Sequence, residues 1–133
     1  YPADYGFFPE TLAMDGDPLD VLVLINEPTF PGCVMEVKPI GVFHMADDKG
    51  PDDKIICVPV SDPIWSSLKD LSDINPHLLK EIEHFFQVYK DLEQKIVDVE
   101  GWGDVNEAMA IIKECTERFD QIENKPAGLF SIK

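Results

Sequence analysis

The stretch that decides the fold reads Asp15-Gly16-Asp17-Pro18-Leu19-Asp20-Val21-Leu22-Val23-Leu24-Ile25. Its second part, Val21–Ile25, is a short apolar run that is typical of a buried strand. Its first part places three carboxylates in a turn-like segment directly before that strand. Like charges held this close repel each other, and folded proteins usually offset the repulsion with a bound cation. A polar turn that binds nothing explains the six residues from Asp15 to Asp20 equally well.

The kind of cation follows from the types of residue in the stretch. Carboxylate oxygens without a nearby His or Cys favour magnesium, manganese or calcium over zinc. An EF-hand is excluded, because its loop needs Gly where Asp20 stands and Glu where Asn26 stands. A Ser-His-Asp triad is poorly supported, because no serine lies in a nucleophile-elbow context.

Composition excludes several other classes of function. The chain has 133 residues, 44% of them hydrophobic, which predicts one globular domain with a real core. Its net charge of −15 argues against nucleic acid and membrane partners, because phosphate backbones recruit Lys and Arg. The cysteines at 33, 57 and 115 form no zinc or redox motif. We expect all three to be reduced core residues of a cytoplasmic protein.

The pattern changes character halfway along the chain. The first half predicts strands over 21–25, 33–45 and 54–60, which suggest a small barrel or a strongly bent sheet. In the second half Asn75 and Pro76 begin one predicted helix, and Asp104 and Glu107 form a capping box for another. We expect an α+β fold with a short strand over 95–99, one domain over 1–121 and a loose tail over 122–133.

A second acidic cluster precedes the predicted strand over 54–60. Asp47, Asp48, Asp52 and Asp53 stand there, and pairing of neighbouring strands would bring this cluster to the first one. Asp52 and Lys54 are two residues apart and share a face if the strand has already begun. That pair would bind both a cation and an anion. A functional role is favoured for Asp47 and Asp52, and a solvated loop for the other two.

These motifs together resemble a known family. The segment from Asp15 to Val21 is similar to the signature of the soluble family I inorganic pyrophosphatases. The similarity continues in order through Tyr1-Pro2-x-x-Tyr5-Gly6, Gly41-Val42, Met45-x-Asp47, Asp52-x-Lys54, His84-Phe85-Phe86-x-x-Tyr89-Lys90-Asp91-Leu92-Glu93 and Val99-Glu100-Gly101-Trp102. It covers nearly all of the chain up to about Phe119.

The resemblance implies a magnesium-dependent hydrolase that splits pyrophosphate into two phosphates on an OB-like β-barrel flanked by two main helices. It implies several magnesium ions, with manganese possible, and a homo-oligomer, with a hexamer favoured. Position by position, it implies that Asp15, Asp20, Asp47 and Asp52 hold metal and that Asp17 deprotonates the attacking water. It implies that phosphate oxygens are held by Tyr5, Lys54, Tyr89 and Lys90.

One departure from the family pattern is apparent. Members also carry a strand with a Lys, an Arg and a Glu upstream of the segment that corresponds to Tyr1, and these three residues have no counterpart here. Arg118 is the only arginine and is expected to lie away from the motifs. We therefore expect this chain to be a shortened form of an active enzyme that is itself impaired or inactive. The competing interpretation is a non-catalytic acidic barrel that binds divalent cations or a protein partner.

Overall fold

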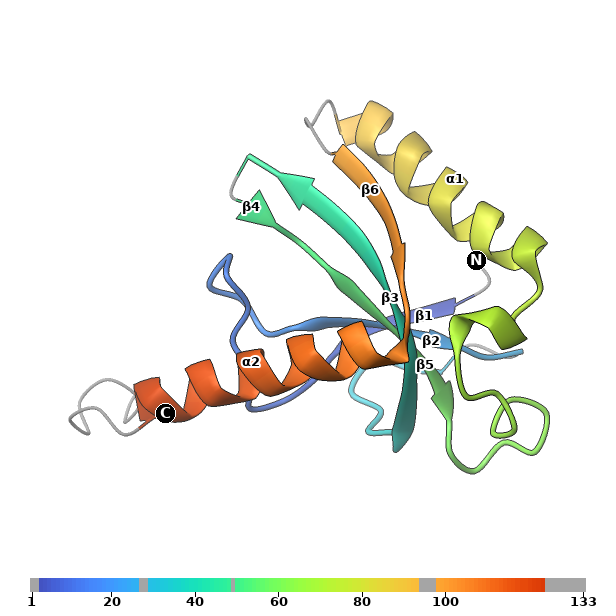
Figure 1. Ribbon diagram of the computed structural model, residues 1–133, viewed down its shortest axis with the longest axis horizontal. Coiled ribbons are helices and arrows are strands. Elements are labelled where there is room, and N and C mark those ends of the chain that lie inside the picture. The colour runs from blue at the N-terminus through green and yellow to red at the C-terminus, as the bar shows by residue number, and fades with distance from the viewer. Residues whose placement is uncertain (1–2, 27–28, 49, 94–97, 124–133) are drawn as a thin grey trace.

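The computed structural model describes residues 3–26, 29–48, 50–93 and 98–123. This part of the chain forms one six-stranded sheet, two main helices and a short 3₁₀ helix (Figure 1). In chain order the elements are β1 (Ala3–Phe7), β2 (Asp20–Leu24), β3 (Val37–Asp47), β4 (Gly50–Pro51), β5 (Lys54–Pro59), η1 (Leu71–Asp73), α1 (Pro76–Glu93), β6 (Asp98–Gly103) and α2 (Val105–Glu123). The predicted α+β class is confirmed.

The sheet places the starts of two strands side by side. Its order is β1-β2-β5-β3-β4, and β6 pairs with the other edge of β3. The β2–β5 pair is parallel and aligns Asp20 with Lys54, whereas the other pairs are antiparallel. The two predicted acidic clusters both lie at this end of the sheet, as expected from the sequence.

The apolar run of β2 is buried on both sides of the sheet. Leu22 and Leu24 belong to one core cluster, and Val21 and Val23 belong to a second. Successive side chains of a strand point to opposite faces, so a strand covered on both faces needs apolar residues at every position. This is why the run is continuous rather than alternating.

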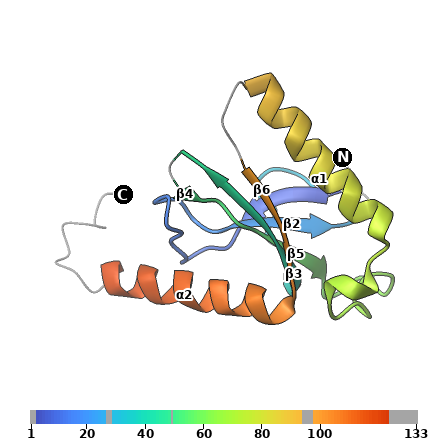
Figure 2. The same cartoon turned by 45° about the horizontal axis from the view of Figure 1, so that its top comes forward.

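Each helix covers one of these two faces. Ile82 and Phe86 of α1 pack into the cluster that contains Leu22, and Ala108 and Cys115 of α2 pack into the other cluster. Figure 2 shows the two helices on different sides of the sheet. Because strand residues alternate, Asp20 is on the same face as Leu22 and therefore on the α1 side.

Both predicted helix starts are confirmed by their hydrogen bonds. Asn75 Oδ1 accepts a bond of 2.9 Å from the His77 amide, with Pro76 as the first helical residue. Asp104 Oδ1 accepts from the Glu107 amide at 2.9 Å, and Glu107 Oε2 accepts from the Asp104 amide at 3.0 Å. This is the reciprocal pattern of a capping box.

Strand β3 bends at two irregularities, which let it pair with β5 early and with β6 later. The register shifts between Pro39 and Gly41 and again between His44 and Met45. At Gly41 an added Cβ would lie 2.2 Å from Leu71 Cγ, so only glycine permits this close approach of η1. The closure of the sheet into a barrel stays a prediction.

Three expectations need correction. Helix α2 continues through Glu123, two residues into the predicted tail, and the remaining 124–133 lie outside the described residues. The strand expected over 95–99 is β6, which begins at Asp98 and runs to Gly103, while 95–97 lie outside the described residues. Trp102 packs on Phe43 at 4.6 Å between ring centroids and keeps the strand in the sheet beyond its predicted end.

The third correction concerns the cysteines. The side chains at 57 and 115 are buried as expected, but Cys33 is exposed. It stands in the 29–36 segment before β3 rather than inside the predicted strand. In the part of the chain that the structure describes, neither helix is long and apolar enough to span a membrane.

Candidate active site

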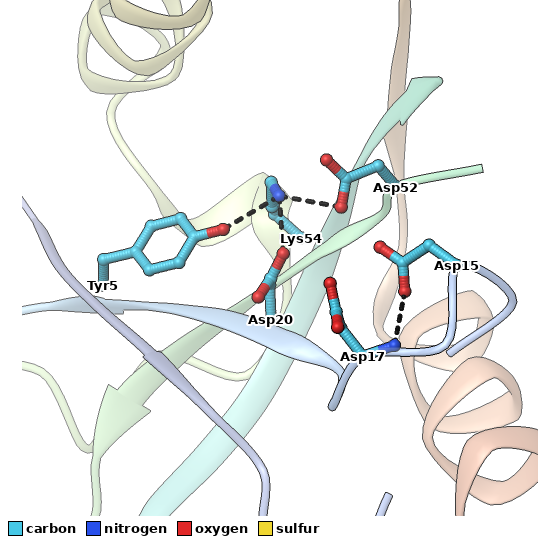
Figure 3. Close-up of polar contacts among 6 residues, drawn as sticks. All are labelled: Tyr5, Asp15, Asp17, Asp20, Asp52 and Lys54. Atoms are coloured by element: carbon cyan, nitrogen blue, oxygen red, sulfur yellow. Dashed lines mark hydrogen bonds and ion pairs between the residues drawn. The ribbon is translucent and has the colours of Figure 1, made fainter. Parts of the chain in front are cut away.

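A buried lysine lies at the centre of the predicted site. Lys54 begins β5 and is only 4% exposed. Its Nζ donates to Asp20 Oδ2 at 2.6 Å, to Asp52 Oδ1 at 2.9 Å and to the Tyr5 hydroxyl at 2.9 Å (Figure 3). The expectation that Asp52 and Lys54 share a face is confirmed. An ammonium has three N–H groups, so all of its donors are engaged.

Strand register explains why these four distant residues meet. Asp20 is directly opposite Lys54 in the parallel β2–β5 pair. Tyr5 is opposite Leu22 in the antiparallel β1–β2 pair, on the face that Asp20 shares. The Asp52 amide donates to the Met45 carbonyl at 2.8 Å, which fixes the short connection from β4 into β5.

The charges of this group are only partly balanced. Burial alone would lower the pKa of Lys54, but its hydrogen bonds to Asp20, Tyr5 and Asp52 outweigh burial and hold that pKa above the ordinary value. Burial raises the pKa of Asp52 more than the bond from Lys54 lowers it. Burial also raises the pKa of Tyr5 to about 12, so the phenol is protonated at neutral pH. Two carboxylates share one ammonium.

The other half of the site is the loop that carries Asp15 and Asp17. The Asp17 amide donates to Asp15 Oδ1 at 3.0 Å, and the Ala13 amide donates to the Asp17 carbonyl at 2.8 Å. Gly16 completes this turn with a φ of +89°, which glycine adopts without strain. In Figure 3 the side chains of Asp15 and Asp17 point toward the space beside Asp20 and Asp52.

These residues form a donor set that suits a hard cation. Within the described residues, neither Asp15 nor Asp17 has an ion-pair partner. Four carboxylates therefore face one ammonium, and all of their donor atoms are oxygens, as magnesium and manganese prefer. No three acidic, His or Cys side chains of the described chain stand close enough together to form a ready metal cluster. Lys54 Nζ lies between the carboxylates of Asp20 and Asp52 and bonds to both.

The remaining predicted residues are less well defined. Asp47 is the last residue of β3 and is paired with Gly50, two residues past the Met45 carbonyl that holds Asp52. Tyr89 and Lys90 lie in α1, on the helix that covers the Asp20 face, but their side chains are outside the described part of the structure. The proposed contacts of these three residues with phosphate or metal stay predictions.

Sequence reasoning missed the residues that hold the loop. Thr11, which is only 5% exposed, accepts from the Leu19 amide at 3.0 Å and donates to the Phe8 carbonyl at 2.6 Å. Arg118 donates to the Leu12 carbonyl at 2.7 Å across a separation of 106 residues. Arg118 contacts no residue of the motifs in these bonds, but Leu12 lies in the loop that leads to Asp15. No local pattern signals a contact between residues so far apart.

One acid expected to be solvated is also paired. Asp53 Oδ1 lies 3.0 Å from His44 Nδ1, and both side chains are half-buried. His44 therefore makes a structural contact with the segment that leads into β5. The pairing fixes the backbone between Asp52 and Lys54, because Asp53 is the residue that separates them.

The chain is similar in sequence to known inorganic pyrophosphatases. The sequence model of the family described as inorganic pyrophosphatase matches residues 1–120. The chain is 56% identical over 121 residues to the inorganic pyrophosphatase of Methanosarcina mazei. The aligned part makes up 91% of this chain and 72% of that relative. It is 47% identical over 119 residues to the inorganic pyrophosphatase of Synechocystis. The aligned part makes up 90% of this chain and 70% of that relative.

Solved structures give the same result. The crystal structure of the inorganic pyrophosphatase from Thermus thermophilus matches with a TM-score of 0.86 and 44% identity, over 90% of this chain and 71% of that one. The inorganic pyrophosphatase from Coxiella burnetii matches with a TM-score of 0.85 and 45% identity, over 90% of this chain and 73% of that one.

Proposed function

The chain belongs to the inorganic pyrophosphatase family, and we propose that the residues around Lys54 together with the Asp15–Asp20 loop form its active site. The activity of the family is the hydrolysis of inorganic pyrophosphate to two phosphates. The observation that carries the site assignment is the imbalance of charge. Asp20 and Asp52 share a single buried ammonium, and the carboxylates of Asp15 and Asp17 point into the space beside them, so the surplus negative charge would attract divalent cations next to an anionic substrate.

The metal is magnesium, with several ions bound and manganese as a possible substitute. Asp15, Asp20 and Asp52 would hold the principal ions, and Asp47 would join Asp52 around further ions that arrive with the substrate. Bound magnesium lowers the pKa of water and neutralises the negative charge of the phosphates. The oxygen-only donor set and the surplus negative charge support this assignment.

Asp17 is the general base. It is exposed and lies in the turn between Asp15 and Asp20, and its carboxylate has no ion-pair partner within the described residues. A carboxylate that is not already neutralised can accept a proton from a water molecule in the site. Asp15 and Asp20 remain as ligands on either side, which leaves Asp17 available for proton transfer.

Lys54 and Tyr5 hold phosphate oxygens. Because all three N–H groups of Lys54 are engaged, it can donate to a phosphate only by giving up one present partner. Asp20 or Asp52 releases such a donor when it turns to a cation. Lys54 therefore serves as a counter-charge for the carboxylates first and as a phosphate ligand second. Tyr89 and Lys90 complete the phosphate contacts from α1.

The test of this function is phosphate release from pyrophosphate by the purified chain. We expect release with millimolar magnesium and none after chelation with EDTA. Asp17→Asn should abolish most of the magnesium-dependent rate, whereas Asp48→Asn, which alters an exposed acid of the neighbouring loop, should retain it. A wild-type chain that neither releases phosphate with magnesium nor binds magnesium in calorimetry would contradict the proposed function.

Three further assignments from the sequence are proposals of the same kind: an OB-like closure of the sheet, a cytoplasmic location and a homo-oligomer with a hexamer favoured. Large exposed apolar side chains support self-association. Phe30 and Val34 are examples, at 70% and 95% exposure. Light scattering on the purified protein gives the mass that decides between a monomer and a hexamer.

A further inference from the structure

We propose that Arg118 is a positioning residue for the reaction, which holds the loop that carries Asp15 and Asp17 against helix α2. The proposal rests on the proposed function in one respect, namely that these two acids belong to the active site. It gives a role to a residue that none of the sequence motifs contains. Arg118 acts through the backbone of the loop and touches neither acid.

The contact is made at Leu12, and it uses both polar groups of that residue. The Leu12 amide donates to the Cys115 carbonyl at 3.0 Å, and the Leu12 carbonyl accepts from Arg118 Nη1 at 2.7 Å. Both partners lie on the same stretch of α2, one turn apart. The amide and the carbonyl of Leu12 are thus both hydrogen-bonded to residues of α2.

Leu12 is joined directly to the turn that aims the carboxylates. The Ala13 amide donates to the Asp17 carbonyl at 2.8 Å, and the Gly16 amide donates to the Ala13 carbonyl at 3.1 Å. A shift of Leu12 therefore shifts the whole turn. At its other end the loop is tied by the contacts of Thr11, Phe8 and Leu19. Arg118 holds the side of the loop that precedes Asp15.

The guanidinium is itself held in place for this contact. Arg118 Nη2 donates to Glu114 Oε1 at 2.7 Å, so one nitrogen is fixed to the helix while the other reaches the loop. The Arg118 side chain is 27% exposed and Glu114 is 61% exposed, so the ion pair contributes little stability by itself. Its effect is orientation. A lysine has no planar fork, so its ammonium does not present two donors at the fixed separation that reaches both the loop and Glu114.

The position of α2 makes this contact consequential. Helix α2 packs on the face of the sheet opposite to the one that carries Asp20 and Lys54. The loop therefore has to bring its carboxylates around the end of β2 toward a site on the other face. Without Arg118, Leu12 keeps its amide bond to Cys115 but loses its carbonyl bond to α2, so the turn is held less firmly relative to the sheet.

The experiment compares three variants with the wild-type protein. Arg118→Met removes the hydrogen bonds to Leu12 and Glu114 and keeps the aliphatic bulk, and Arg118→Lys restores the positive charge without the planar fork. Lys113→Met is the matched control, because it removes one positive charge from an exposed position of the same helix. The readouts are amide hydrogen exchange without metal, magnesium affinity by calorimetry without pyrophosphate, and the rate of pyrophosphate hydrolysis.

In Arg118→Met we expect the hydrogen-bonded loop amides, those of Leu12, Ala13, Gly16 and Asp17, to exchange at least tenfold faster. Exchange in β2 and β5 should stay within twofold of wild type. Magnesium affinity should fall on the order of tenfold, as it does when supporting partners of metal ligands are lost. Arg118→Lys should recover part of both effects, and Lys113→Met should show neither.

Two results would overturn the proposal. One is loop exchange and magnesium affinity in Arg118→Met that stay within twofold of wild type. The other is exchange that rises equally in the loop, β2 and β5, which marks a general loss of stability. If Arg118→Met does not fold, Arg118→Lys is judged by the same limits. A wild-type chain that neither hydrolyses pyrophosphate nor binds magnesium would contradict the proposed function alone, because loop exchange is measured independently of both.

Discussion

The two halves of the proposed active site are stabilised in different ways. In the sheet half, Asp20 and Asp52 are fixed by strand register and share the buried ammonium of Lys54. In the loop half, Asp15 and Asp17 are fixed by backbone hydrogen bonds and have no ion-pair partner among the described residues. The chain thus neutralises part of its own charge and leaves the rest unpaired for a ligand.

This difference separates folding from function. The sheet half lies next to the core, where an unpaired carboxylate is costly, and Lys54 offsets that cost without any metal. The loop half is exposed, so its charges remain hydrated and tolerable until a cation binds. Substitutions in the sheet half should therefore change stability first. Substitutions in the loop half should change catalysis and metal binding.

The largest expected effect is the fall in the rate of pyrophosphate hydrolysis caused by Asp17→Asn. Loss of a general base lowers turnover by about 10²–10⁴-fold, or about 3–5 kcal/mol in activation free energy. Because Asp17 is exposed, its free energy of unfolding should change by less than about 0.5 kcal/mol. Steady-state kinetics and urea denaturation measure the two quantities, with Asp48→Asn as the control. A rate within threefold of wild type would show that another group accepts the proton.

Lys54→Met tests the sheet half and should reverse this pattern. Removal of the ammonium leaves Asp20 and Asp52 facing each other without compensation. Their side chains are 24% and 25% exposed, so we expect a loss of about 3 kcal/mol of unfolding free energy, the lower end for a broken buried ion pair. Magnesium should restore part of this loss. The control Lys113→Met should lose less than about 1 kcal/mol of unfolding free energy. A loss as small as this in Lys54→Met, measured by urea denaturation, would contradict the account.

The smallest effect is expected from Tyr5→Phe, and it depends on pH. The pKa of Tyr5 is raised from 10.0 to about 12 in the folded protein by burial. A group with a raised folded pKa stabilises fully below its unfolded pKa, and the contribution disappears as pH rises through the folded value. The stability difference between wild type and Tyr5→Phe, about 1 kcal/mol, should be constant up to about pH 10 and shrink towards pH 12. A difference that grows over this range would show the opposite shift.

The sequence predicts what is local or periodic in this molecule. The apolar run of β2, both helix caps and the shared face of Asp52 and Lys54 follow from spacing and residue type alone. The meeting of Asp20 with Lys54 needs the strand order, which spacing does not contain. The role of Arg118 depends on a contact between segments 106 residues apart, and the continuation of β6 through Trp102 depends on a partner ring. Such features arise only from packing.

The central claim is that the two halves form one site for magnesium. Its most direct test is calorimetric titration of magnesium, without pyrophosphate, into wild type, Asp15→Asn, Asp52→Asn and the control Asp48→Asn. We predict that a substitution in either half weakens magnesium binding at least tenfold and that the control binds as wild type does. Unchanged affinity in Asp15→Asn alongside lost affinity in Asp52→Asn would contradict the claim, because the loop would then take no part in holding the metal.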